Sequence, residues 1–553
     1  MKCMKKETIF WILLIIFSVG FASWLMFHTF SYDIIDPSMR IAAKAWSDFG
    51  AHIPLIRSFS LGNNWPPEYP LFPGEPIRYH FLFYFLVGML EKAGLRIDWA
   101  LNIPSIIGFT GLMIGIAILA QKLFNDKRIT VLSVLFFLFN GSLSWIRFFI
   151  AHPPSIHSLQ DIVTNTTFPS FAPWGDGDIS AFWNLNIYTN QRHLGFAFAL
   201  VCVFIIILLH IENKKMREQM WYLIPLISIS AIFPYFHQPM LLILALCMLC
   251  YFLLFPKLRG ILLLTGIFSF ICVVPQILSF PTQSKQLIHW YPGYLIHDSL
   301  TISHFFLYWF QNIGLHLLLI PIGWILASKK AKKIFIPYFL LFVLANTVQF
   351  SSEIVGNHKF LNFFLIIGHI YSAYSIIMIM NMINRKHHLI IRCITRSIAI
   401  TIICILILSG FIDGAAVAND EKISLTDISG DTVTHWIYLN TPPTSIFLTQ
   451  DYFMQPPSVA GRPIFLGWPY FPWSLGYDTQ KRGNSIKQIF QSTSKQDACL
   501  LLISNNISYI FYNTNSAVSP NTQQVSPLYV YNFTPLYTNA DGFIILDIAN
   551  NCQ

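Results

Sequence analysis

Long apolar runs divide most of this chain into segments that can cross a membrane. A transmembrane helix needs about 20 consecutive apolar residues, and eleven runs near this length occur before residue 414. They lie at residues 9–28, 101–121, 129–149, 193–211, 219–236, 238–256, 260–280, 304–327, 334–351, 359–382 and 396–413. Residues 1–413 are therefore predicted to form an all-α polytopic membrane domain of about 11–13 transmembrane helices.

Lysine and arginine are concentrated in every second loop between these runs. Short basic loops are retained on the cytoplasmic side of a membrane. The basic loops lie at residues 2–6, 122–128, 214–217, 257–259, 329–333 and 385–396. We therefore predict a cytoplasmic amino terminus, an outside carboxyl terminus, and two long outer loops at residues 29–78 and 150–192.

The segment at residues 79–94 is apolar enough to suggest a further crossing. A crossing there would place every later basic loop on the wrong side of the membrane. We expect a short dipping or juxtamembrane helix instead, unless one of the eleven runs is not a true crossing.

Composition and charge agree with a membrane protein. Hydrophobic residues make up 54% of the chain and charged residues 11%, with a mean hydropathy of +0.55. The net charge of +9 is mostly in the cytoplasmic loops, where it meets anionic lipid headgroups. Nucleic acid is therefore not an expected partner. The first apolar run lacks a small-residue cleavage site and is expected to remain as an anchor.

The nine cysteines show no zinc-ligand spacing. Cys499 and Cys552 are the two in the predicted outside tail, where thiols can oxidise. A bridge between them and two free thiols are both compatible with the sequence.

The composition changes beyond residue 413, where Asp, Asn, Thr, Pro and Gly become frequent. Short β-branched and aromatic runs predict strands, at residues 445–449, 462–467, 507–513, 528–533 and 543–548. Helical patterns occur at residues 424–439 and 485–505. Residues 414–553 are thus predicted to form an extracytoplasmic soluble α/β domain that acts as a cap or acceptor-binding lid.

Ionisable side chains cluster in the first outer loop, in a chain that otherwise contains few of them. The cluster consists of Asp48, His52, Arg57, Glu68, Glu75 and Arg78. Ionisable residues beside a membrane span indicate a functional site. We therefore expect chemistry at the outer membrane surface.

Residues 46–88 resemble the first extracytoplasmic loop of the GT-C superfamily of membrane glycosyltransferases. In that superfamily an acidic residue follows the first span, then a short helix ending near glycine, and then a Pro-rich stretch leading to an aromatic helix. All three parts occur here in order. The tail segment at residues 460–482 resembles that of uncharacterised prokaryotic members, which favours a plasma (inner) membrane location.

The resemblance implies transfer of a hexosyl or pentosyl group from a polyprenyl-phosphate carrier to a glycan, lipid or protein acceptor. A carboxylate can take the proton of an acceptor hydroxyl as the anomeric bond breaks. Asp48 is the candidate general base, and direct displacement inverts the anomeric centre. The alternative role for Asp48 is to cap the helix that follows.

The departing lipid phosphate requires cations near the outer headgroups. Two outer loops supply them just before spans, through Arg192 with His193 and through His358 with Lys359. Snorkelling to lipid headgroups is the alternative for Arg192 and Lys359.

Three first-loop residues complete the predicted substrate-binding set, namely His52, Arg78 and His80. Arginines such as Arg57 and Arg78 more often neutralise neighbouring carboxylates than bind substrate, so we expect this role for Arg57 and keep it as the alternative for Arg78.

Some GT-C members hold a divalent metal with outer-loop carboxylates, and the second outer loop offers Asp176 and Asp178. Such oxygen ligands suit Mg²⁺ or Mn²⁺. An acidic glycine-rich stretch also forms simple turns, so metal dependence stays open.

A transporter and a non-catalytic scaffold are competing classes. A secondary transporter carries ionisable residues near span midpoints and has repeated halves, whereas here charges gather in outer loops and no repeat is visible. A scaffold would keep the fold without the base. Activity lost in Asp48→Asn at unchanged expression separates an enzyme from a scaffold.

Overall fold

The computed structural model describes residues 2–175, 177–280, 288–386, 389–450, 453–514 and 532–553. The chain divides into two compact units. Unit 1 comprises Met1–Thr29, Ile103–Ile277 and Leu287–Glu421, and unit 2 comprises Phe30–Asn102, Leu278–Gln286 and Lys422–Gln553. The predicted first outer loop and the predicted tail domain therefore belong to the same unit.

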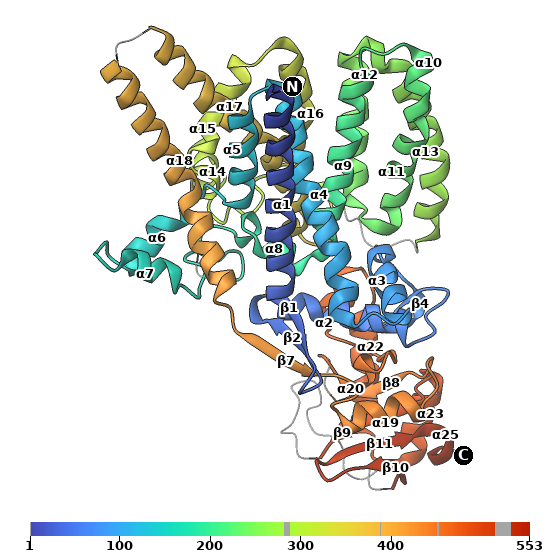
Figure 1. Cartoon of the computed structure of the whole chain (residues 1–553). Helices are drawn as coiled ribbons and strands as arrows, with labels where there is room; N and C mark the ends of the chain where they lie inside the picture. Colours follow the sequence, from blue (N-terminus) through green and yellow to red (C-terminus); the bar gives the residue numbers. More distant parts are fainter. Residues whose placement is uncertain (1, 176, 281–287, 387–388, 451–452, 515–531) are drawn as a thin grey trace. The chain divides into compact units, whose positions relative to one another are not determined.

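Unit 1 is helical, and its long apolar helices run side by side (Figure 1). In the described part of the chain, seven helices are long and apolar enough to cross a membrane. They are Lys6–Thr29 in α1 (Lys2–Thr29), Ile97–Phe124 (α4), Arg192–Ile211 (α9), Met216–Phe236 with α11 (Leu223–Phe236), Pro256–Ser279 with α13 (Arg259–Ser279), Ile354–Ile383 in α17 (His358–Lys386) and Ile390–Ala418 in α18 (Leu389–Ala418).

An eighth span arises if the bent pair α14 (Ile302–Ile313) and α15 (His316–Leu326) is one crossing. The two helices meet at an angle of 92°. Gly314 joins them with a φ of 55°, and a Cβ there would collide with the Gly141 carbonyl oxygen. Only glycine adopts this conformation without strain, so the bend is encoded in the sequence.

Other predicted spans correspond to shorter helices. They are α5 (Lys127–Leu138), α12 (Pro239–Leu254) and α16 (Lys329–Ala345). The predicted span at residues 129–149 is interrupted, because α5 ends at Leu138 and α6 (Ser144–Ala151) is a separate helix. A segment of 12 residues is shorter than a full crossing. The segment after Tyr79 forms the short helix α3 (Leu82–Lys92), as predicted.

Unit 2 joins the first outer loop to the start of the tail through a three-stranded antiparallel sheet. Strand β1 (Phe30–Asp33) pairs with β2 (Ser38–Ala42), and β2 pairs with β7 (Lys422–Thr426) in the register Arg40–Ser424. Helix α2 (Trp46–Ser60) follows β2 and packs against α3. The hairpin of β3 (Glu68–Tyr69) and β4 (Phe72–Pro76) links these two helices.

The rest of unit 2 is an α/β arrangement, as the sequence predicts. Its four-stranded sheet has the order β10-β11-β9-β8. These strands are β8 (Phe447–Thr449), β9 (Tyr509–Asn513), β10 (Pro535–Thr538) and β11 (Phe543–Asp547). The accompanying helices are α19 (Thr432–Asn440), α20 (Pro456–Val459), α21 (Tyr470–Ser474), α22 (Thr479–Gln491), α23 (Lys495–Ser504) and α25 (Ile548–Asn551).

Three of the element predictions for the tail need correction or fall outside the described residues. Residues 462–467 form no named strand, and a single bridge joins Ile464 to Phe447. The predicted helix at residues 424–439 begins as strand β7, because β2 offers it a partner that lies far away in sequence. The predicted strand at residues 528–533 lies mostly outside the described residues.

Of the two states that the sequence left open for Cys499 and Cys552, the structure has the disulfide. Their Cα atoms are 5.4 Å apart, within the range of a disulfide. The bridge ties α23 to the chain after α25. A structural disulfide is typical of an extracytoplasmic domain, which agrees with the predicted topology.

Reduction is expected to free two further cysteines for alkylation. Under denaturing, non-reducing conditions the chain should take up two fewer alkyl groups than after reduction, because the Cys499–Cys552 bridge protects both thiols. Intact mass measures the uptake, and Cys499→Ser should remove the difference. Equal uptake by the wild type in both conditions would contradict the bridge.

Candidate functional site

Asp48 lies in the first turn of α2 and is half-buried. The residue that caps this helix is Ala45, and no side chain accepts a hydrogen bond there. The capping role is therefore wrong, because α2 begins before Asp48.

Two tyrosine hydroxyls lie within electrostatic reach of Asp48. Tyr79 and Tyr84 are hydrogen-bonded to one another. Burial, together with the Asp48 charge, raises the pKa of both phenols well above the ordinary value. Both hydroxyls therefore stay protonated at neutral pH.

Aromatic rings hold the neighbouring histidines of unit 2. His52 is 5% exposed and stacks on Tyr84 with ring centroids 4.6 Å apart. His80 is also 5% exposed, and its ring lies 3.9 Å from that of Tyr79. Of the predicted first-loop residues, Asp48, His52 and His80 thus share one aromatic environment built on Tyr79 and Tyr84.

Arg57 belongs to a buried ion triad. It is 4% exposed, its Nη2 lies 2.9 Å from Asp427 Oδ1, and its Nε lies 3.3 Å from Glu91 Oε1. The Ser60 hydroxyl donates to Glu91 at 2.6 Å. The expectation that Arg57 neutralises carboxylates is confirmed, and the triad fixes α2 against α3 and the start of the tail.

Arg78 is also engaged within unit 2. Its Nη2 lies 2.7 Å from Glu75 Oε2, and its guanidinium lies over the Tyr477 ring at 4.4 Å from the centroid. A further N–H donates to the Gly476 carbonyl. These contacts join the β4 hairpin to the loop after α21, and substrate binding by Arg78 stays a prediction.

Arg192 opens helix α9 in unit 1 and is 1% exposed. Its guanidinium donates to the Thr189 carbonyl at 2.8 Å, to Thr29 Oγ1 at 2.8 Å and to Met26 Sδ at 2.8 Å. A side chain held this way does not reach headgroups, so the snorkelling alternative is wrong for Arg192. An ionisable residue buried in a membrane domain indicates a functional role.

The two predicted cation loops lie next to one another in unit 1. His358, the first residue of α17, is 2% exposed, and its Nε2 lies 3.3 Å from Nε2 of Gln191. Its ring stacks on Phe182 at 4.5 Å, and Asn362 contacts its Nδ1 at 3.3 Å. The residue before Arg192 therefore touches the residue before Lys359, which brings both basic pairs to one place.

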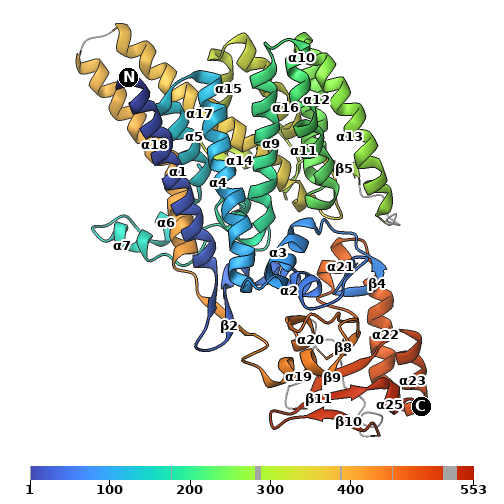
Figure 2. The ribbon, with the colours of Figure 1, turned by 45° about the vertical axis from the view of Figure 1, so that its right-hand side comes forward.

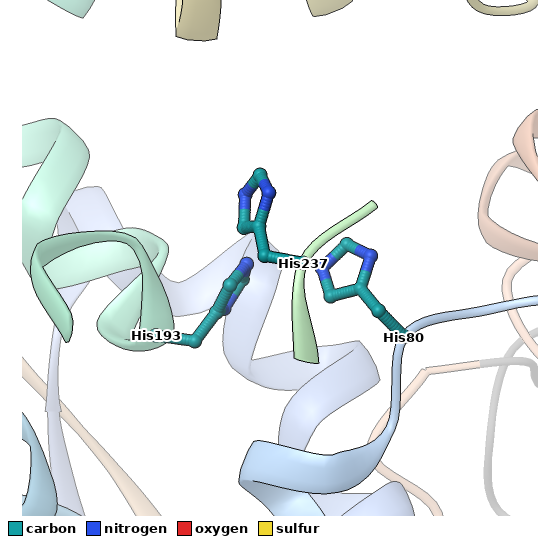
Figure 3. A group of neighbouring side chains, drawn as sticks. All are labelled: His80, His193 and His237. Atoms are coloured by element: carbon teal, nitrogen blue, oxygen red, sulfur yellow. The ribbon is translucent and has the colours of Figure 1, made fainter. Parts of the chain in front are cut away.

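His193 lies beside a histidine that the sequence did not single out. The rings of His193 and His237 have centroids 5.0 Å apart, and both side chains are at most 1% exposed (Figure 3). His237 directly follows α11. His80, also drawn in Figure 3, belongs to unit 2.

The described part of the second outer loop does not assemble a carboxylate set for a divalent metal. Asp178 is 55% exposed, and its Oδ2 lies 2.9 Å from Nη2 of Arg147. A cation at this distance occupies the oxygen that Mg²⁺ or Mn²⁺ would need. Asp176 lies outside the described residues, so its role stays a prediction.

A buried polar network in unit 1 escaped the sequence analysis. Asp413, near the end of α18, accepts hydrogen bonds from Asn140 at 3.1 Å and Asn184 at 3.3 Å. A cavity of about 20 Å³ lies beside this network, lined by polar residues that include Asn140, Asn312, Asn362, His316 and His369. It has room for about one water molecule. The signal was present as lone polar residues inside apolar runs.

No protein-family model and no curated protein matches this sequence. Among solved structures, the arabinofuranosyltransferase AftD from Mycobacteria is similar with a TM-score of 0.55 at 9% identity, over 98% of this chain and 40% of that one. ArnT from Cupriavidus metallidurans, bound to undecaprenyl phosphate, is similar with a TM-score of 0.51 at 9% identity, over 97% of this chain and 98% of that one. The apo oligosaccharyltransferase of Archaeoglobus fulgidus is similar with a TM-score of 0.50 at 12% identity, over 90% of this chain and 69% of that one.

The chain has the GT-C fold. The resemblance expected from residues 46–88 is thereby confirmed for the fold, as are the polytopic helical domain and the α/β tail. A GT-C fold with seven apolar helices makes this a multi-pass membrane protein. At identities of 9–12% the likeness extends to the fold alone, so the chemistry has to come from this chain's own residues.

Proposed function

We propose that this protein is a membrane glycosyltransferase that moves a hexosyl or pentosyl group from a polyprenyl-phosphate carrier to an acceptor outside the cytoplasm. The observation that carries the proposal is the half-exposed carboxylate of Asp48 in the first turn of α2, in a chain with the GT-C fold. The solved ArnT structure holds undecaprenyl phosphate, which supports this class of carrier.

Asp48 is the general base of the proposed reaction. The acceptor oxygen attacks the anomeric carbon while the bond from that carbon to the phosphate oxygen breaks. Asp48 takes the acceptor proton, and the polyprenyl phosphate leaves with the bonding electron pair. One direct displacement inverts the anomeric centre. The protonated hydroxyls of Tyr79 and Tyr84 lie within electrostatic reach of this carboxylate.

Arg192, His358 and Lys359 form the proposed phosphate site. The Gln191–His358 contact supports this grouping, because it holds the amino-terminal ends of α9 and α17 together. Backbone N–H groups at helix amino termini favour anions. Arg192 adds a positive charge in a protein interior, where such a charge acts strongly on a developing phosphate anion.

Transfer activity of the purified protein tests the proposal. The full chain in lipid nanodiscs is given polyprenyl-phosphate-linked hexoses and pentoses together with glycan, lipid and peptide acceptors. Release of polyprenyl phosphate that depends on an acceptor, with an inverted product linkage, is the expected result. Absence of release with every donor and acceptor would favour the scaffold reading, and retained linkage geometry would reject direct displacement.

Replacing Arg192 by leucine is expected to lower kcat/KM for the lipid-linked donor by about 10- to 100-fold, the usual effect of losing a charged hydrogen-bond donor. Arg192→Lys keeps the charge and should recover part of the activity. Arg147→Leu is the matched control, because Arg147 is 55% exposed and pairs with Asp178. Donor titrations measure the effect, and unchanged donor kinetics in Arg192→Leu would remove Arg192 from the site.

A further inference from the structure

Unit 2 exposes a patch of aromatic side chains around α21, which is labelled in Figure 2. Trp468 is 45% exposed, Tyr470 40% and Trp473 43%. Between Gly467 and Tyr477 the exposed large hydrophobic side chains are these three aromatic ones. Exposed apolar patches mark interaction sites, and this one presents ring faces bearing indole N–H and phenol O–H groups.

The patch continues as a series of ring contacts to the helix that carries Asp48. The ring centroid of Tyr470 lies 6.1 Å from that of Trp473 and 6.0 Å from that of Phe471. The ring centroid of Phe453 lies 6.5 Å from that of Phe471 and 6.2 Å from that of Trp468. All of these residues belong to unit 2.

The series ends at the amino-terminal turn of α2. Phe453 lies 5.9 Å from Trp46, which precedes Asp48 by two residues. A Cβ at position 50 would collide with the Phe453 ring, so Gly50 is what lets this ring approach α2. An extended molecule lying along the rings would therefore arrive beside the proposed base.

The chemistry of the patch fits a carbohydrate chain. Sugar rings have apolar C–H faces and hydroxyl edges, so they stack on flat aromatic rings and hydrogen-bond to the polar groups at the ring margins. The indole N–H and phenol O–H groups of the three exposed rings can hydrogen-bond to sugar hydroxyls, which acyl chains do not offer. This hydrogen-bonding capacity favours a glycan over a lipid surface.

We propose that Trp468, Tyr470 and Trp473 form a glycan platform that binds the acceptor, so that the enzyme extends a carbohydrate chain. The proposal rests on the proposed function and specifies its acceptor. Phe453 and Phe471 support the exposed rings, and Trp46 positions the last sugar near Asp48.

Binding of oligosaccharides to the full chain in nanodiscs tests the platform. The probes are linear mannan, arabinan and glucan oligosaccharides of about three to six sugars, with peptides as comparison. Trp468→Ala and Trp473→Ala are each expected to weaken oligosaccharide binding about tenfold, the effect of removing one stacking ring. Trp65→Ala is the matched control, because Trp65 is 68% exposed in the same unit and lies against Phe85.

Lipids with brominated acyl chains separate a glycan platform from a membrane-seated patch. Quenching that is lost in Trp468→Ala and Trp473→Ala would place these rings in the bilayer and overturn the proposal. Oligosaccharide binding that is absent in the wild type, or equal in the wild type and both variants, would also overturn it.

The Asp48→Asn variant distinguishes failure of the platform from failure of the proposed function. It should bind the oligosaccharides as the wild type does, because the rings are intact. Binding without any sugar transfer by the wild type would leave the platform in place and reject the transferase. Sugar transfer at the wild-type rate in both Trp468→Ala and Trp473→Ala would leave the transferase in place and reject the platform.

Discussion

Asp48→Asn is expected to lower kcat about 10²- to 10⁴-fold, the range for removal of a general base. Asparagine keeps the shape and the first-turn position of the side chain on α2 but accepts no proton at neutral pH. Because asparagine is isosteric with aspartate, the fold should be unchanged. Single-turnover transfer from a lipid-linked sugar measures the loss, and thermal unfolding verifies the fold.

Asp36→Asn is the matched control for this experiment. Asp36 lies in the turn between β1 and β2, in the same outer loop, and its side chain is 68% exposed. It should transfer sugar at the wild-type rate. Asp48→Glu moves the carboxylate by one methylene and should retain partial activity. Wild-type turnover by Asp48→Asn would remove Asp48 as the base.

Arg57→Leu is expected to destabilise unit 2 by about 3–5 kcal/mol, the cost of leaving buried charges without their partner. Glu91 and Asp427 would then face each other beside an apolar side chain. The melting temperature of the purified protein measures the loss. Arg40→Leu is the control, because Arg40 also pairs with two carboxylates, Asp33 and Asp36, but its side chain is 33% exposed, so a smaller change is expected.

Lowering the pH should reduce the loss of stability caused by Arg57→Leu. Burial already raises the pKa of Glu91, and Arg57 lowers it. Without Arg57 the pKa of Glu91 in the folded chain rises further above its ordinary value. As the pH falls, Glu91 is then protonated in the folded chain before it is protonated in the unfolded chain, so the stability loss shrinks. Glu91→Gln in the Arg57→Leu background should give a similar recovery at neutral pH, and a penalty independent of pH would contradict this account.

Periodicity and charge predicted the membrane domain, because apolar length and loop charge are local properties of the chain. The same local signals placed α3, β9 and β11. They failed at the segment after α18, where a helical pattern begins as β7. Pairing with β2 decided that outcome, and a partner so distant in sequence is invisible to a local pattern.

The candidate site was predictable to a similar degree. Scarcity of outer-loop charge singled out Arg192 and His358, and the Gln191–His358 contact brings their loops together. The pairing of Arg57 with carboxylates was expected. Asp427 was not expected as a partner, because it lies beyond the last span. Asp413 and Asn140 were missed because each is a single polar residue in an apolar run, and Asn184 because an amide in an outer loop gives no local signal.

The pairing of β2 with β7 sets an order on biosynthesis. The ribosome completes the first outer loop early, yet the strand that closes its sheet emerges only after α18 has been made. Until then β2 lacks the strand that covers its edge, and Arg57 lacks Asp427 as a partner. Chains that terminate early should therefore be inert and short-lived, and the helix bearing Asp48 should mature only when translation reaches the tail.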